Sequence, residues 1–254
     1  MSVFDFRVWI LFATVSCVIA AVQVGDITTV CKRNDPNLSE CMKNSAHSIR
    51  SKLGKGIKQL RIPKMDPMII PKVHLASGGG PVSLDSTFTN VEVEGLSNYE
   101  IKNINIDFDR KEIQAEAFVP VLNMKSQYET NGKILNLPIT GSGDSHSKYT
   151  GVKANIKLKF KPENRNGQEY WNLEKSDFDV DVQHADIYLD NLFNGNKQLG
   201  DTMNTLIAEN WQLVFQEMKP AVRDTVNALV SDMTSKVFNH FSLEELFPSQ
   251  SSLI

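Results

Sequence analysis

The chain has 254 residues, of which 41% are hydrophobic and 22% charged, an ordinary globular composition that allows one large domain or two small ones. It carries 27 basic and 30 acidic residues, so its formal net charge is −3. Because Lys and Arg do not cluster with interleaved aromatic residues, we expect no nucleic-acid partner.

The first 21 residues have the layout of a secretory signal peptide. Residues 1–7 include one basic residue, residues 8–22 are almost uniformly apolar or small, and candidate cleavage points follow Ala20 and Ala21. The alternative is a membrane anchor, but the apolar run is shorter than the ~20 residues that span a bilayer. We therefore expect a leader over 1–21 and one secreted domain over 22–254, without stable membrane insertion.

The cysteines fit secretion. Cys17 lies in the expected leader, which leaves Cys31 and Cys41 to form a disulfide in an oxidising compartment. A metal site is the alternative, but two cysteines without a nearby His pair supply too few ligands. Between them, Asn37 begins the only N-glycosylation sequon and is a candidate for glycosylation.

Residues 38–81 contain three different sequence patterns in succession. Apolar residues at helical spacing predict a helix over 38–53, ended by Gly54 and Gly56. Residues 62–71 contain three prolines, which forbid a regular helix or central strand, so we expect an extended connector there. The glycine-rich residues 77–81 predict a turn or flexible loop.

Alternation of apolar and polar residues dominates from 82 to 189. Strands with one apolar and one wet face are typical of an antiparallel sheet. A change of parity at Val91 indicates a bulge. Asn131-Gly132 predicts a tight hairpin between strands at 124–130 and 134–139.

An apolar stripe that steps by three or four residues marks the C-terminal region. Its members are Met203, Ile207, Trp211, Val214, Met218, Val222, Val226, Leu229, Met233, Val237 and Phe241. The stripe predicts one amphipathic helix of about 40 residues, or two joined at Pro220, that covers the apolar face of the sheet. Unbroken, it would span roughly 60 Å, against a diameter of ~45 Å for a compact sphere of this chain. We expect both a bend at Pro220 and an elongated molecule.

An ordered set of segments along the mature chain resembles one known family. The segments are Cys31 with Cys41, residues 62–71, Gly95 to Ile101, Tyr128 with Gly132 to Gly143, Asn191 to Gly200, Asn210-Trp211, Pro220 and Phe247-Pro248. Together they are similar to the takeout-like and juvenile-hormone-binding proteins of insects. The resemblance implies an α+β fold, in which a long C-terminal helix is wrapped by a highly curved antiparallel sheet around an apolar tunnel. It also implies a secreted carrier, in haemolymph or sensory fluid, for a juvenile-hormone-like terpenoid, fatty acid or other lipid-like ligand.

Motifs of catalysis are missing from the sequence. It has no G-x-S-x-G and no H-E-x-x-H, and its five histidines are far apart. Asp177, Asp179 and Asp181 resemble the start of a calcium loop but lack its Gly and closing Glu, so we interpret them as a solvated strand face. We expect no enzyme activity, catalytic residue, metal or cofactor. A secreted esterase is an alternative without a visible nucleophile.

The expected ligand site combines helix and sheet. Its predicted residues are Met203, Ile207, Trp211, Phe215 and Met218 from the helix, and Phe118, Tyr128, Ile139 and His184 from the strands. Tyr128 or His184 would orient a polar group of the ligand, although a histidine hydrogen-bonded within the core is the plainer interpretation of His184. Strand alternation leaves open which sheet face lines the cavity. We expect a monomer. The alternative function is a secreted interaction or signalling protein with a dry core that acts through its surface.

Overall fold

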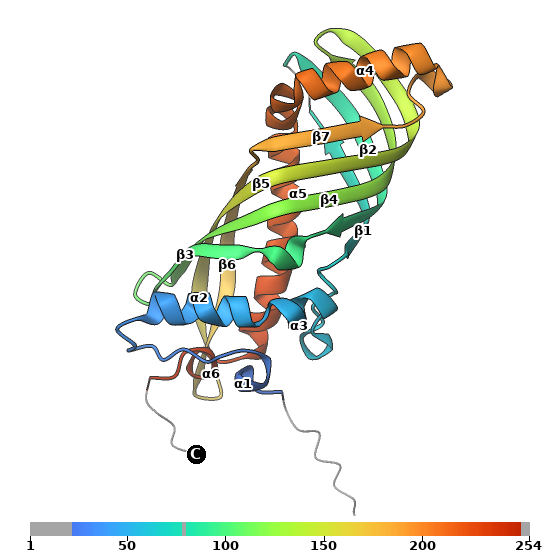
Figure 1. The fold of residues 1–254 in the computed structure, drawn as a ribbon. Helices are drawn as coiled ribbons and strands as arrows, with labels where there is room; N and C mark the ends of the chain where they lie inside the picture. Colours follow the sequence, from blue (N-terminus) through green and yellow to red (C-terminus); the bar gives the residue numbers. More distant parts are fainter. Residues whose placement is uncertain (1–21, 78–79, 250–254) are drawn as a thin grey trace, which may run out of the picture.

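The computed structural model describes residues 22–77 and 80–249. Within them, an antiparallel sheet of seven strands wraps around one long C-terminal helix, and the molecule is elongated along that helix (Figure 1). This arrangement confirms the α+β architecture. The signal peptide expected over 1–21 lies outside the described residues.

Two very long strands organise the sheet. The strands are β1 (Met68–Ala76), β2 (Val82–Glu94), β3 (Glu100–Asp107), β4 (Glu112–Ile134), β5 (Leu137–Arg165), β6 (Gln168–Asp181) and β7 (His184–Leu189). The main path runs β1-β2-β4-β5-β6, with β3 paired to β4 and β7 paired to β5. We refer to β4 and β5 as the central strands.

The turn between the central strands lies four residues beyond the predicted one. Asn131-Gly132 was expected to form the hairpin turn, but β4 continues through it and turns at Leu135 and Asn136, both at positive φ. Ile134 pairs with Leu137 across this two-residue loop. The longer strands bury both Ile134 and Ile139, each 1% exposed, and that burial outweighs the local turn preference.

The edge strand β1 explains the proline-rich segment. The expected connector over 62–71 is extended, but its last residues form the start of β1, which pairs with β2 alone. Pro71 is tolerated because an edge strand need not donate from every residue. It lies beside the predicted bulge of β2, where the β2–β4 register shifts between Thr89 and Glu92 and Asn90 has φ 51°.

The C-terminal helix breaks at Asn210, not at Pro220. The two helices are α4 (Lys197–Glu209) and α5 (Trp211–His240), and α5 runs through Pro220. At the break, Asn210 leaves helical geometry and its side-chain Nδ2 donates to the carbonyl of Leu206 at 2.8 Å. The backbone N–H of Asn210 donates to the same carbonyl at 3.1 Å, so the side chain adds a second hydrogen bond at the end of α4. Figure 1 shows α4 crossing the upper end of the molecule and α5 running down its length.

Short helices close the lower end. They are α1 (Val24–Ile27), α2 (Leu38–Ser48), α3 (Arg50–Lys55) and α6 (Leu243–Leu246), with 3-10 turns η1 (Lys58–Leu60), η2 (Leu96–Asn98) and η3 (Phe193–Gly195) elsewhere. The helix predicted over 38–53 is therefore two helices, and Gly56 at φ 83° ends the second. The expected Cys31–Cys41 disulfide is present and joins α2 to the segment before it.

Buried apolar residues form separate clusters along the molecule. The upper cluster lies beneath α4 and includes Tyr128, Ile134, Ile139, Met203, Ile207 and Met218. The middle cluster centres on Val119, Val152, Phe178, Val180 and Phe215. The lower cluster, beside the disulfide, includes Phe160, Trp171, Leu243 and Phe247. All three take residues from the central strands, so β4 and β5 connect the two ends.

Candidate functional site

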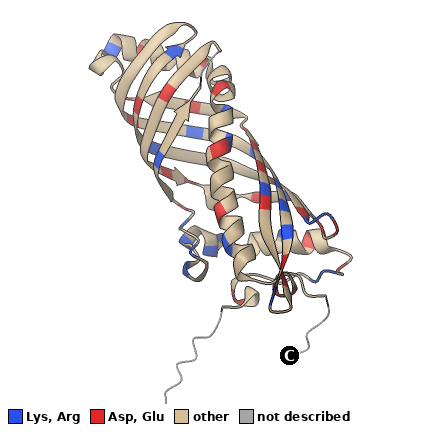
Figure 2. Ribbon diagram, turned by 180° about the vertical axis from the view of Figure 1, so that it is seen from behind, with Lys and Arg blue, Asp and Glu red and all other residues tan. Residues whose placement is uncertain are grey.

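Helix α5 lies along the edges of the curved sheet and stays away from its centre. Its backbone comes closest to β6 and also approaches β7, β1 and β2, whereas the central strands remain farther from it. Seen from behind, α5 runs down the back of the molecule beside the sheet (Figure 2). The space between α5 and the central strands is therefore filled by side chains alone, and their sizes decide how much room remains.

Ion pairs fasten α5 to β6. Lys219 Nζ lies 3.2 Å from Asp179 Oδ1 and 2.8 Å from Asp181 Oδ1, and an Arg223 Nη2 lies 2.9 Å from Asp177 Oδ1. Partial burial alone would lower the pKa of Lys219, but the two carboxylates outweigh it and raise that pKa. The three aspartates, expected as a solvated face, are thus partners of the helix. Among the described residues no cluster of His, Cys, Asp or Glu fits a metal ion.

The middle of the interior is lined by small or aliphatic side chains that keep accessible surface. On the strands these are Ala115, Ala117, Ala154 and Ile156, and on α5 they are Val222, Val226 and Val230. Ala117 pairs with Ala154 across the central strands, so the inner-face side chains are shortest there. Side chains on the apolar face of a sheet lose nearly all accessible surface when a helix packs directly on them. Ala115 and Ile156 also line a hollow on the outer face, so part of their exposure is to the outside. The small size of the alanines is what leaves volume between the sheet and α5.

Five predicted ligand-site residues meet in the upper cluster. Tyr128 and Ile139 from the central strands lie with Met203, Ile207 and Met218 from the helices, and all five are buried. The Tyr128 hydroxyl donates to the backbone carbonyl of Asp190 at 2.6 Å. Burial raises the pKa of Tyr128 to about 12, with a contribution from the Asp190 charge, so the phenol is neutral at physiological pH. The hydroxyl proton of Tyr128 is already engaged in the hydrogen bond to Asp190.

The other four predicted residues are divided between the middle cluster and the surface. Phe215 is buried there, and Trp211 packs against the same cluster. His184 is exposed, with its Nε2 3.0 Å from Asp186 Oδ1 and its ring 5.2 Å from that of Trp211. Phe118 lies on the opposite sheet face from Val119, and Lys102 Nζ lies 5.1 Å from its ring centre. The structure therefore brings neither His184 nor Phe118 into the interior, because alternation along each strand turns them outward.

Polar side chains on the inner face were missed by sequence reasoning. Ser126, Ser145 and Ser147 are buried on the face that carries Tyr128, and Tyr149 continues their row on β5. Burial raises the pKa of Tyr149, a tendency that its hydrogen bond with Ser147 reduces. Serine is most often exposed, so these residues gave no apolar signal in the sequence. The run of alanines at 115 and 117 was a signal for spare volume, because small residues at inward positions leave room.

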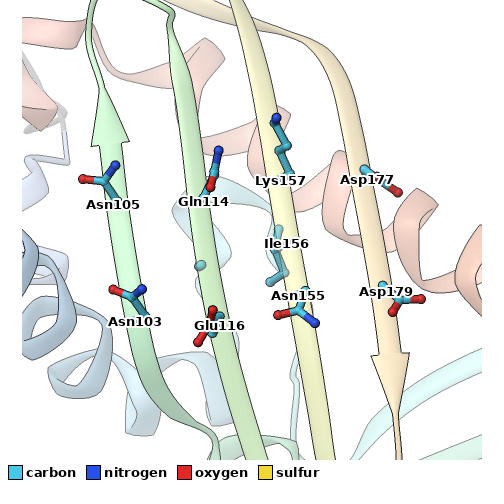
Figure 3. A pocket seen from close by; sticks show the side chains of 10 residues that line it. Asn103, Asn105, Gln114, Glu116, Asn155, Ile156, Lys157, Asp177 and Asp179 are labelled. Carbon is cyan, nitrogen blue, oxygen red and sulfur yellow. The ribbon is translucent and has the colours of Figure 1, made fainter.

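The outward face of the sheet is polar. A hollow of about 220 Å³ crosses β3 to β6 and is lined by Asn103, Asn105, Gln114, Ala115, Glu116, Asn155, Ile156, Lys157, Asp177 and Asp179 (Figure 3). A larger open groove of about 840 Å³ lies between α4 and the strands, with charges of both signs such as Lys125, Lys148, Asp186 and Asp201. Neither hollow contains a predicted ligand-site residue. In the part of the chain that the structure describes, no helix is long and apolar enough to cross a membrane.

A family comparison decides the identity of the fold. Residues 9–248 match the model of the haemolymph juvenile hormone binding protein (JHBP) family. The chain belongs to this family. The match spans the strands, the lower helices and the C-terminal helices, so the whole described architecture is that of a JHBP-family protein.

Individual relatives of this JHBP-family chain support the same family assignment. It is 22% identical over 254 residues to the circadian clock-controlled protein daywake of Drosophila melanogaster, with 96% of this chain and 97% of the relative covered. It is 23% identical over 221 residues to the "Putative beta-carotene-binding protein" of Schistocerca gregaria, with 85% and 86% covered. The crystal structure of Epiphyas postvittana Takeout 1 superposes with a TM-score of 0.68 at 26% identity, covering 83% of this chain and 92% of that one. The resemblance to takeout-like proteins is confirmed, and the chain is a member of a family of hydrophobic-ligand carriers.

Proposed function

We propose that this protein is a secreted, monomeric carrier that holds one small apolar molecule, terpenoid or fatty-acid-like, between α5 and the central strands. The observation that carries the proposal is the inner row of small residues Ala115, Ala117 and Ala154, on strands whose backbone stays farther from α5 than the backbone of β6 does. Membership of a hormone-binding family and similarity to a beta-carotene-binding relative support it. Secretion is supported by the disulfide and by the haemolymph description of the family.

Burial of apolar surface is sufficient to hold such a ligand. A molecule of about fifteen carbons gains roughly 0.8 kcal/mol per buried methylene-sized group, ~12 kcal/mol in all. Association costs at least ~4 kcal/mol, which leaves ~8 kcal/mol, or about micromolar affinity. The upper cluster, with Met203, Ile207 and Met218, would form one end of the bound ligand's environment, and Trp211 and Phe215 its side. Methionine suits this role because its flexible side chain adapts to different shapes.

Filling the interior tests the proposal. Ala154 packs against the middle cluster, so it points inward. Asn155, the next residue on β5, lines the outer hollow (Figure 3). Ala154→Phe should weaken uptake of the neutral fluorescent probe N-phenyl-1-naphthylamine by at least ~10-fold, since a buried ring occupies the volume of several ligand carbons. Asn155→Phe adds the same ring outside and should leave affinity unchanged. Urea unfolding shows whether each variant is folded.

Two results would contradict the carrier. If the native protein takes up no apolar probe in a saturable manner, its core is dry and it acts through its surface. If both phenylalanine variants bind like the native protein, the ligand lies elsewhere. Mass spectrometry of organic extracts from the protein purified from its native source identifies the natural ligand.

A further inference from the structure

Helix α2 lies along the outer edge of β3 at the lower end of the molecule (Figure 1). β3 pairs with β4 alone, so the backbone groups on its other edge need partners outside the sheet. Two hydrogen bonds join this edge to the last turn of α2. The backbone N–H of Ile101 donates to His47 Nε2 at 2.9 Å, and the Tyr99 hydroxyl donates to the backbone carbonyl of Ala46. We refer to these two hydrogen bonds as the α2–β3 contact.

The hydrogen bond from Ile101 requires a neutral histidine. A ring nitrogen accepts a hydrogen bond only when it carries no proton, so the proton of neutral His47 is on Nδ1. In the imidazolium both ring nitrogens carry protons, and the Nε2 proton would then point at the N–H of Ile101. Protonation of His47 therefore removes this hydrogen bond and leaves the N–H of Ile101 without its partner.

The charges around His47 favour its neutral form. Partial burial lowers the pKa of His47, and Arg50 and Lys43 lower that pKa further by repulsion between positive charges. Glu100 and Glu40 raise the pKa, but by less, so it stays below its usual value of 6.5. The negative end of the α2 dipole would favour a cation in this last turn, but the hydrogen bond to β3 is open to the neutral ring alone.

Three other histidines have the opposite kind of partner. Each lies beside a carboxylate: His74 Nδ1 is 3.6 Å from Asp85, His146 Nε2 is 3.7 Å from Asp190, and His184 Nε2 is 3.0 Å from Asp186. A carboxylate nearby favours the imidazolium. Mild acid therefore leaves these three contacts in place, whereas it breaks the hydrogen bond that His47 accepts.

The disulfide limits how much of α2 the contact controls. Cys41, near the start of the helix, is joined to Cys31, and the next residue, Met42, is buried in the lower cluster. The end of the helix instead adjoins Tyr99, whose ring packs against the middle cluster and lies 5.3 Å from the Arg50 guanidinium carbon. Loss of the α2–β3 contact therefore loosens the end of α2, while its start stays attached.

We infer that His47 makes the α2–β3 contact a pH-sensitive switch, which holds the end of α2 on β3 at neutral pH and releases it when the ring is protonated in mild acid. Since the folded state disfavours the proton, the unfolded chain takes it up first as the pH falls. The stability that His47 contributes is therefore fully present well above pH 6.5 and is lost as the pH falls below that value. The switch does not depend on what the interior binds.

Hydrogen exchange of the Ile101 amide tests the inference directly. Its rate is compared with that of the unfolded chain at the same pH, which cancels the pH dependence of the exchange chemistry. Between pH 8 and pH 5 the native protein should lose about 3- to 10-fold of this protection. His47→Gln keeps an acceptor, the side-chain Oε1, without a titratable ring, so its protection should be equal at both pH values. His184→Gln removes an exposed histidine instead and should behave like the native protein.

A second measurement needs no variant. Nuclear magnetic resonance of the His47 ring in the native protein should show its proton on Nδ1 at pH 8 and a titration midpoint below 6.5. The inference is overturned if the proton is on Nε2, if the ring titrates at or above 6.5, or if the native protein keeps equal protection of the Ile101 amide at both pH values. Equal losses of protection in the native protein and His47→Gln would also overturn it, because another group would then be responsible.

Discussion

Asn204 should be among the residues on which the upper end depends most. It is 8% exposed on α4, and its side chain bonds to both backbone groups of Leu189: Oδ1 accepts from the N–H at 3.0 Å, and Nδ2 donates to the carbonyl at 2.9 Å. Leu189 lies on β7, which pairs with β5 alone, so its free backbone groups point toward α4. One amide thereby satisfies the edge of the sheet and attaches the helix that covers it.

Asn204→Leu keeps the approximate volume and removes both hydrogen bonds. The N–H and carbonyl of Leu189 are then left buried without partners, at about 1–3 kcal/mol each. We expect the free energy of unfolding to fall by ~2–6 kcal/mol. Because urea slopes are about 1–3 kcal/mol per M, the midpoint should move down by roughly 1–3 M. Equilibrium unfolding followed by circular dichroism measures it.

The neighbouring Thr205 provides the control. Its hydroxyl donates only to the carbonyl of Asp201 within α4, and the residue is exposed. Thr205→Ala should change stability by less than ~0.5 kcal/mol, as is usual at the surface. If Asn204→Leu unfolds at the same urea concentration as Thr205→Ala, the two hydrogen bonds do not hold α4 on β7, and the reasoning is refuted.

Three further changes probe other parts of the fold. Gly132→Ala should lower the melting temperature by at least ~4 °C, because a Cβ there, at φ 154°, would lie 2.0 Å from the Ser83 carbonyl oxygen; an unchanged melting temperature would contradict the close approach of β2 and β4. Partial burial would raise the pKa of Asp66, but hydrogen bonds from the Ser97 side chain, the Gly95 N–H and the Ser97 N–H outweigh it and lower that pKa below 3.8. The stability that Asp66 contributes is thus present at neutral pH and lost as the pH falls below about 4. The difference in urea midpoint between Asp66→Asn and the native protein should therefore shrink from pH 7 to pH 3. A constant difference would exclude this linkage. Asn37 is exposed and its side chain makes no helix-capping bond, so secreted protein should shift in electrophoresis after peptide-N-glycosidase treatment and Asn37→Gln should not; identical mobilities would show an unused sequon.

Periodic patterns predicted the architecture because they report burial directly. The inward row Ile113, Ala115, Ala117 and Val119 is apolar at every second residue, and that alternation faces α5 as expected. The apolar stripe of the helices likewise identified Met203 and Ile207 as interior residues. Predictions from apolar periodicity hold in the folded structure, because the core that they describe supplies most of the stabilisation.

Local signals failed where long-range packing outweighed them. Asn131-Gly132 is a strong turn sequence, but the burial of Ile134 and Ile139 required longer strands. Pro220 suggested a kink, yet the chain leaves helical geometry at Asn210, and α5 continues through Pro220. Phe118 was misplaced because a large aromatic residue suggests a core position, whereas here it lies under Lys102 on the outer face. The burial of Ser126 and Ser145 could not be predicted, because serine is most often exposed and gives no apolar signal.

The order of elements along the chain has a consequence for biosynthesis. The strands end at Leu189, and α5, which covers their apolar face, is complete only at His240. At ~5–20 residues per second, a ribosome needs on the order of 3–10 s to add the residues between them. For that interval the apolar inner face of the strands lacks the helix that covers it in the folded protein, so the nascent chain is prone to aggregation.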